Sequence, residues 1–182
     1  MGKELDKASI LKQIWDARRA HKEWVRRADR LVNGINGFRG EKVTLELDKE
    51  YIPLDSSSCI FGKWWNEYSF LISQLKGIDN ISSRIEEHHD RLHDTYASIY
   101  HIFFVLPEKR SILHKILTFN KKDVTDSERE QAKIHFEYLV HSSSELLEVL
   151  HVLEERIQNL DNAQIFKNLH LTSDSPNKYT DH

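Results

Sequence analysis

The 182-residue chain has few of the residues that break helices, cross-link a fold or span a membrane. It contains 6 Gly, 3 Pro and a single Cys. One cysteine excludes a disulfide within the chain, which is typical of proteins from reducing compartments. The longest apolar run, residues 102–106, is too short to cross a bilayer, and the first residues lack the apolar stretch of a signal peptide. We therefore expect a soluble, cytoplasmic protein with no membrane insertion.

The chain also has no strong excess of either charge. Its 26 Lys and Arg residues oppose 29 Asp and Glu residues, which gives a net charge of −3 with neutral histidines. This balance gives no reason to expect a nucleic-acid partner. A local basic cluster, Arg18, Arg19, Arg26 and Arg27, is followed by Asp29. We interpret that cluster as a solvated helix face rather than a phosphate-binding site.

Apolar residues recur in steps of three and four over long stretches, which is the pattern of amphipathic helices. The pattern predicts helices over residues 6–33, 59–75, 80–106 and 127–160, with residues 108–119 also helical beyond Pro107. Gly34, Gly37 and Gly40 are expected to end the first helix, and Gly77 the second. A serine of the segment 55–58 is expected to cap the second helix, and Thr125 or Asp126 the last. The predicted inner stripe of the last helix comprises Ile134, Leu139, Leu146, Val149, Leu150, Leu153 and Ile157.

These elements predict an all-α fold, an antiparallel four-helix bundle with an extra loop or short helix. The alternating residues 43–47 could form a short extended piece within the loop 36–55. We expect one domain over residues 1–165. The polar tail, residues 166–182, is expected to be disordered.

Three short stretches carry the residues with the most distinctive chemistry. The first has His21 followed three positions later by Trp24, the second reads Cys-Ile-Phe-Gly-Lys-Trp over residues 59–64, and the third is His-Asp-Arg-Leu-His over residues 89–93. His89 and His93 are four apart, so on a helix both imidazoles lie on one face. Together with Cys59 and His21 they supply three imidazoles and one thiolate, a complete tetrahedral shell for Zn²⁺.

Each stretch taken alone has a plainer interpretation. Cys59 could be a small buried apolar residue, His21 a satisfied core histidine, and His89 and His93 a partly exposed pair on a polar face. Against this, Cys59 is predicted at a helix start, where unpaired N–H groups and the helix dipole favour the thiolate over the thiol. Trp24 and Trp64 flank the three stretches and could exclude water from a site, or simply pack in the core.

Neighbouring residues on the third stretch have predicted roles as well. His88 lies about 100° around the helix from His89 and is expected to be a bystander. Glu86 or Asp90 could orient a ligand imidazole by accepting a hydrogen bond from it.

Taken in order, the three stretches resemble the bacterial chemoreceptor zinc-binding domain. Its pattern is His-x-x-aromatic, then Cys-x-Φ-Gly-x-Φ, then His-x-x-x-His, where Φ is apolar or aromatic. The resemblance implies a four-helix bundle that holds one Zn²⁺ through His21, Cys59, His89 and His93, often as a homodimer. The intervals between the stretches, 37 and 29 residues, are longer than we expect for the family. An insertion in the loop 36–55 would account for the first.

The same resemblance implies a role in signal transduction and no enzymatic activity. Members of the family sit on chemoreceptors and diguanylate cyclases and report zinc or oxidants such as hypochlorous acid. We therefore expect docking to such a signalling protein, in chemotaxis or cyclic-di-GMP control. The ligand set itself leaves open whether the zinc is structural or regulatory.

Other functions compete with this interpretation. A di-iron bundle needs Glu-x-x-His motifs on two helices, and the chain offers Glu86 with His89 and Glu148 with His151. A zinc hydrolase needs a coordination position left open for water, which four protein ligands would close. The remaining alternative is a helical interaction module with no metal.

Overall fold

The structure is a computed structural model that describes residues 5–34, 53–105, 124–162 and 165. Within these ranges there are four α-helices, one 3₁₀ turn and no strand, which confirms the all-α prediction. The elements in chain order are α1 Lys7–Asn33, η1 Ser56–Ser58, α3 Ile60–Ser73, α4 Asp79–Phe104 and α6 Asp126–Asn159.

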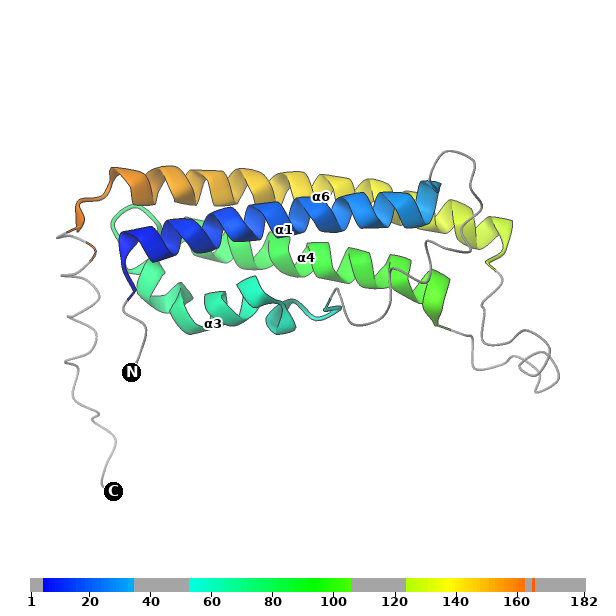
Figure 1. Ribbon diagram of the computed structural model, residues 1–182, viewed down its shortest axis with the longest axis horizontal. Helices are drawn as coiled ribbons and strands as arrows, with labels where there is room; N and C mark the ends of the chain where they lie inside the picture. Colours follow the sequence, from blue (N-terminus) through cyan, green and yellow to red (C-terminus); the bar gives the residue numbers. More distant parts are fainter. Residues whose placement is uncertain (1–4, 35–52, 106–123, 163–164, 166–182) are drawn as a thin grey trace, which may run out of the picture.

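The helices form a bundle in which consecutive helices run in opposite directions (Figure 1). Helix α6 packs against both α1 and α4, and α3 contacts α1 and α4. Helix α3 has 14 residues against 27 in α1, so it covers only part of the bundle. No described helix combines the length and the apolar character that crossing a membrane requires.

Side chains at the helix ends explain where the helices begin. Asp6 and Ser9 form a capping box at the start of α1, and Thr125 and Glu128 form another at the start of α6. The expectation that a serine caps α3 is wrong, because Cys59 itself is the cap residue and the helix begins at Ile60. Gly34 and Gly77 have φ of 76° and 81°, a conformation that favours glycine after a helix.

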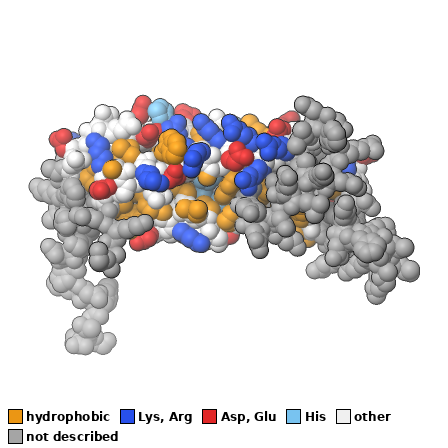
Figure 2. All heavy atoms as spheres, in the orientation of Figure 1, with side chains coloured by type: hydrophobic (Ala, Val, Ile, Leu, Met, Phe, Trp, Pro, Cys, Tyr) orange, Lys and Arg blue, Asp and Glu red, His pale blue; other side chains and the backbone are white. Residues whose placement is uncertain are grey.

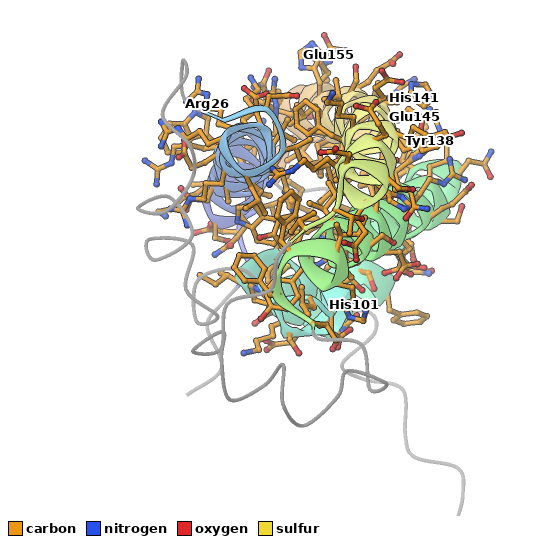
Figure 3. All side chains as sticks on the ribbon, turned by 90° about the vertical axis from the view of Figure 1, so that its right-hand side faces the viewer. Arg26, His101, Tyr138, His141, Glu145 and Glu155 are labelled. Carbon is orange, nitrogen blue, oxygen red and sulfur yellow. The ribbon has the colours of Figure 1, made fainter. Side chains whose placement is uncertain are left out.

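The core lies between the inner faces of the four helices. Seen along the bundle axis, Arg26, His141 and Glu155 point outward from the ring of helices (Figure 3). The predicted inner stripe of α6 is buried except for Ile134, which is 53% exposed. Ala132 takes the buried position instead. A step of two residues turns a helix by about 200°, so Ile134 faces solvent.

The basic residues of α1 lie on an outer face of the bundle (Figure 2). Arg18 pairs with Glu154 of α6, while Arg26 and Arg27 both pair with Glu23. Arg19 pairs with Asp16 and also stacks over the Trp15 ring. Arg19 and Arg26 fit the interpretation of a solvated helix face, whereas Arg18 does not, because it is partly buried in an ion pair between α1 and α6.

Several sequence predictions fall outside the described residues. They concern the helical segment 108–119, the change of direction at Pro107, the extended piece at 43–47, most of the loop 36–55 and the tail 166–182. The 3₁₀ turn η1, Ser56–Ser58, was not predicted from the sequence.

Candidate metal centre

Four side chains from three parts of the chain meet in the interior of the bundle. His21 comes from α1, Cys59 from the cap of α3, and His89 and His93 from α4. One potential ligand atom from each lies within 4.8 Å of the others. The ligand atoms of a tetrahedral zinc site are about 3.3–3.6 Å apart, from metal–ligand distances of 2.0–2.3 Å. The distance from Cys59 Sγ to His89 Nε2 is already 3.3 Å. The cluster could therefore hold a metal ion.

The four residues are almost completely shielded from solvent. Their exposed fractions are 1% for His21, 2% for Cys59, 4% for His89 and 1% for His93. Buried polar atoms nearly always have a hydrogen-bond partner. Here the Nε2 atoms of His21 and His93 are buried and have none. A metal ion bound between these two nitrogens and the Cys59 sulfur would give each unpaired nitrogen a partner for its lone pair.

Main-chain carbonyls fix which ring nitrogen of each of these histidines is free. His21 Nδ1 lies 2.7 Å from the Ala17 carbonyl oxygen, and His93 Nδ1 lies 3.0 Å from the Pro53 carbonyl oxygen. A carbonyl oxygen can only accept, so each Nδ1 carries the hydrogen and donates it. The lone pair is then on Nε2, the unpaired atom. Histidine ligands of metals are oriented in this way.

Burial keeps the imidazoles neutral. It lowers the pKa of His21 to about 4 and that of His89 to about 3. Burial also lowers the pKa of His93, although hydrogen bonds to the backbone and the nearby Asp55 and Asp90 carboxylates act in the opposite direction. Neutral imidazole is the form that coordinates metal ions, so the site needs no proton release from its histidines near neutral pH.

The Cys59 sulfur accepts a hydrogen bond from the backbone N–H of Gly62, at 3.1 Å. Burial nevertheless raises the pKa of the Cys59 thiol, and the N–H groups of Gly62 and Phe61 offset only part of that increase. The expectation that the helix start makes Cys59 a thiolate is therefore wrong for the thiol by itself. A bound cation would supply the missing stabilisation, because a coordinating thiol is deprotonated by its metal.

Gly62 allows the turn η1 to lie directly on the first turn of α3. A Cβ atom at this position would be 1.9 Å from the Ser56 carbonyl oxygen. The turn η1 belongs to the segment that connects Pro53 with Cys59. The carbonyl group of Pro53 orients His93. The glycine of the sequence motif thus positions two of the four candidate ligands.

Aromatic rings enclose the cluster. The Trp24 ring meets His21 and His93 edge-on, with ring centroids 4.9 Å and 4.8 Å apart. Phe61 packs in the same manner against His89, at 5.1 Å. Trp64 lies one layer further out and contacts Phe61. Trp24 and Phe61 therefore form part of the wall of the cluster, and Phe61 is a wall residue that sequence reasoning missed.

The predicted second-sphere acceptors have other partners. Glu86 accepts a hydrogen bond from Trp65 Nε1, and Asp90 accepts one from Ser56 Oγ. The hydrogen bonds that orient His21 and His93 are accepted instead by the backbone carbonyl groups of Ala17 and Pro53. A backbone acceptor leaves no trace in residue identity, so the sequence carried no signal for it.

Two further histidines lie apart from the cluster. His88 Nδ1 faces Glu145 of α6 at 3.4 Å, in agreement with its prediction as a bystander. His151, which the di-iron alternative requires, has a side chain that is 54% exposed and lies near Glu154 and Glu155. The second Glu-x-x-His motif therefore points to solvent, away from His89.

Comparison of the chain with known proteins found no matching family model, no matching curated protein and no matching solved structure.

Replacing Gly62 with alanine should weaken metal binding about 10- to 100-fold, the range observed when groups that position ligands are lost. The added methyl would push η1 away from α3 and displace the carbonyl that orients His93. A competition titration with a chromophoric chelator measures the affinity. The exposed neighbour Lys63 provides the control, because Lys63→Ala leaves this contact intact. Wild-type affinity in Gly62→Ala would show that the close contact does not position the ligands.

The metal-stripped protein should lose stability in acid. The pKa of His21 is about 4 when folded against an ordinary value of 6.5, so only the unfolded chain binds this proton between those values. The contribution of His21 to the free energy of unfolding is therefore complete above about pH 6.5 and is lost as the pH falls toward about 4. Urea unfolding at pH 7.5 and pH 5 measures the change in midpoint. His21→Leu should show a smaller decrease than the exposed-site control His151→Ala, and equal decreases would refute this account.

Proposed function

We propose that the protein is a zinc-binding sensory or regulatory domain in which His21, Cys59, His89 and His93 hold one Zn²⁺. The observation that carries the proposal is the pair of buried Nε2 atoms, on His21 and His93, that lack any hydrogen-bond partner beside a buried thiol. Leaving such atoms unpaired costs about 1–3 kcal/mol each. A cation that accepts electron pairs from all four side chains would remove this cost.

The donor set favours zinc among the common metals. Three imidazoles and one thiolate are a combination that suits Zn²⁺, whereas hard cations such as Mg²⁺ and Ca²⁺ prefer oxygen ligands. Four protein ligands would complete a tetrahedral shell and leave no position for a catalytic water. This supports a structural or regulatory centre rather than a hydrolase.

A regulatory role gains support from where the ligands come from. They join α1, the start of α3 and α4, so the free energy of metal binding is coupled to how these helices pack. Together with the resemblance to the chemoreceptor zinc-binding domain, this coupling leads us to propose a cytoplasmic signalling module that works as a homodimer. Its partner in this proposal is a chemoreceptor or a diguanylate cyclase, and its signal is zinc or an oxidant.

Replacing Cys59 with alanine tests the zinc site directly. Structural zinc sites contribute about 10–16 kcal/mol over four ligands, so losing one ligand should weaken zinc binding by about 100-fold or more. Chelator competition measures the affinity, and elemental analysis of the purified protein measures the stoichiometry, expected to be one zinc per chain. His151→Ala, an exposed histidine outside the cluster, should bind as the wild type does. Unchanged affinity and stoichiometry in Cys59→Ala would remove the proposal.

Oxidation of the Cys59 sulfur is the proposed route by which an oxidant would act. Conversion of the thiolate to sulfenic acid weakens the metal–sulfur bond, so hypochlorous acid should release zinc from the wild type. Cys59→Asp retains an anionic ligand without an oxidisable sulfur and should need a higher dose. A zinc-responsive dye follows the release, and equal doses for the two proteins would argue against oxidant sensing.

A further inference from the structure

The segment Pro53–Ser58, here called the strap, borders the cluster and contacts two of its members, His93 through a hydrogen bond and Cys59 through the chain. The Pro53 carbonyl oxygen accepts the hydrogen bond from His93 Nδ1, and the strap ends next to Cys59. His93 lies on α4 with His89, but its ring is oriented by the strap, whereas the ring of His21 is oriented by a carbonyl group of its own helix, α1. Because all four ligands are at most 4% exposed, a metal ion can enter or leave only if some covering element moves.

Hydrogen bonds within the strap join its residues into one piece. The Asp55 carboxylate accepts hydrogen bonds from the backbone N–H and the hydroxyl of Ser57 and from the hydroxyl of Ser58. These bonds lie within the strap and would survive its displacement. The strap has no long helix of its own to anchor it, since η1 spans only Ser56–Ser58.

One side-chain contact fastens the strap to α4 without using a candidate ligand. The Ser56 hydroxyl donates to the Asp90 carboxylate, with a distance of 2.5 Å between the oxygens. Asp90 follows His89 directly in α4, so this hydrogen bond closes the strap over the turn that carries the ligands. The Asp55 and Asp90 carboxylates also place negative charge beside His93, where a cation would approach.

We propose that the strap is the gate for metal exchange and that the hydrogen bond from Ser56 to Asp90 is its latch. This inference rests on the proposed metal-binding function and adds the way in which the site is opened. Opening would remove the hydrogen bond that orients the His93 ring and would move Cys59, while His21 keeps its hydrogen bond within α1. Because the latch contains no ligand atom, it holds the strap equally with and without a bound ion. Loosening it should therefore speed metal entry and metal release by the same factor and leave the affinity unchanged.

Stopped-flow kinetics of Zn²⁺ binding to Ser56→Ala test the gate. Trp24, which contacts His21 and His93, reports arrival of the ion, and excess chelator measures its release. Both rate constants should rise about fivefold, the effect expected for the loss of one solvent-exposed hydrogen bond, while the dissociation constant stays within about twofold. The control is Ser83→Ala, which removes another exposed serine hydroxyl that bonds only within α4, to the Asn80 carbonyl oxygen. Its rates should match those of the wild type.

Each other result would overturn the gate in a distinct way. A faster release with unchanged entry, and thus weaker affinity, would make Ser56 a structural support of the bound state only. Unchanged rates would show that metal exchange takes another route. Either result would leave the zinc function intact, because the wild type would still bind the ion. A wild-type protein that binds no Zn²⁺ would refute the proposed function and the gate together.

Discussion

The constraint on which the rest of this structure depends is the burial of imidazole rings that are only half satisfied. His21 and His93 each use one ring nitrogen to donate to a main-chain carbonyl, and the other nitrogen has no hydrogen-bond partner. Such atoms are uncommon in protein interiors, and of the five that the described residues contain, these two lie within a few ångströms of a third imidazole and a thiol. Without a metal ion, this arrangement costs free energy because the buried nitrogens have no partner. With a metal ion, the same nitrogens would be ligands.

The carbonyl groups that hold these rings come from very different kinds of backbone. The Ala17 carbonyl belongs to the helix turn that precedes His21, so its position follows from α1 itself. The Pro53 carbonyl lies in an irregular segment, and its position depends on how closely that segment approaches α3. Gly62 makes the approach possible, because any side chain there would collide with Ser56. The orientation of His21 is thus determined by the geometry of α1, whereas that of His93 depends on the single close contact between Ser56 and Gly62.

Sequence patterns predicted the helices well because long helices are determined by local periodicity. Bounds differed from prediction by at most two residues, and Thr125 was correctly among the expected caps. Ile134 was assigned to the core in error, since the stripe of α6 runs through Ala132 and the choice depends on small offsets in register. The Cys59 cap was missed because a serine-rich segment beside it offered more common capping residues.

The site was only partly predictable, for a physical reason. The spacing of His89 and His93 places both on one face of a helix, but no spacing rule brings His21 and Cys59 to that face. Their convergence followed from combining three motifs and required the tertiary structure to be seen. Burial is also a property of the folded chain, and for this reason the pKa of Cys59 moves opposite to the direction that its helix position suggested. The glycine, by contrast, gave a usable signal, because glycine in a first helical turn often marks a close approach.

The short length of α3 has a consequence for how a change at the centre would spread. Helix α6 packs along α1 and α4 and contributes no residue to the cluster, so it acts as a fixed support for its two neighbours. Helix α3 has about half the residues of α1 and a correspondingly smaller packed face, yet its cap residue is one of the four candidate ligands. Loss of that attachment would therefore shift α3 more than any other helix. The apolar side chains that it already presents to solvent, Ile60 and Phe70, would move with it.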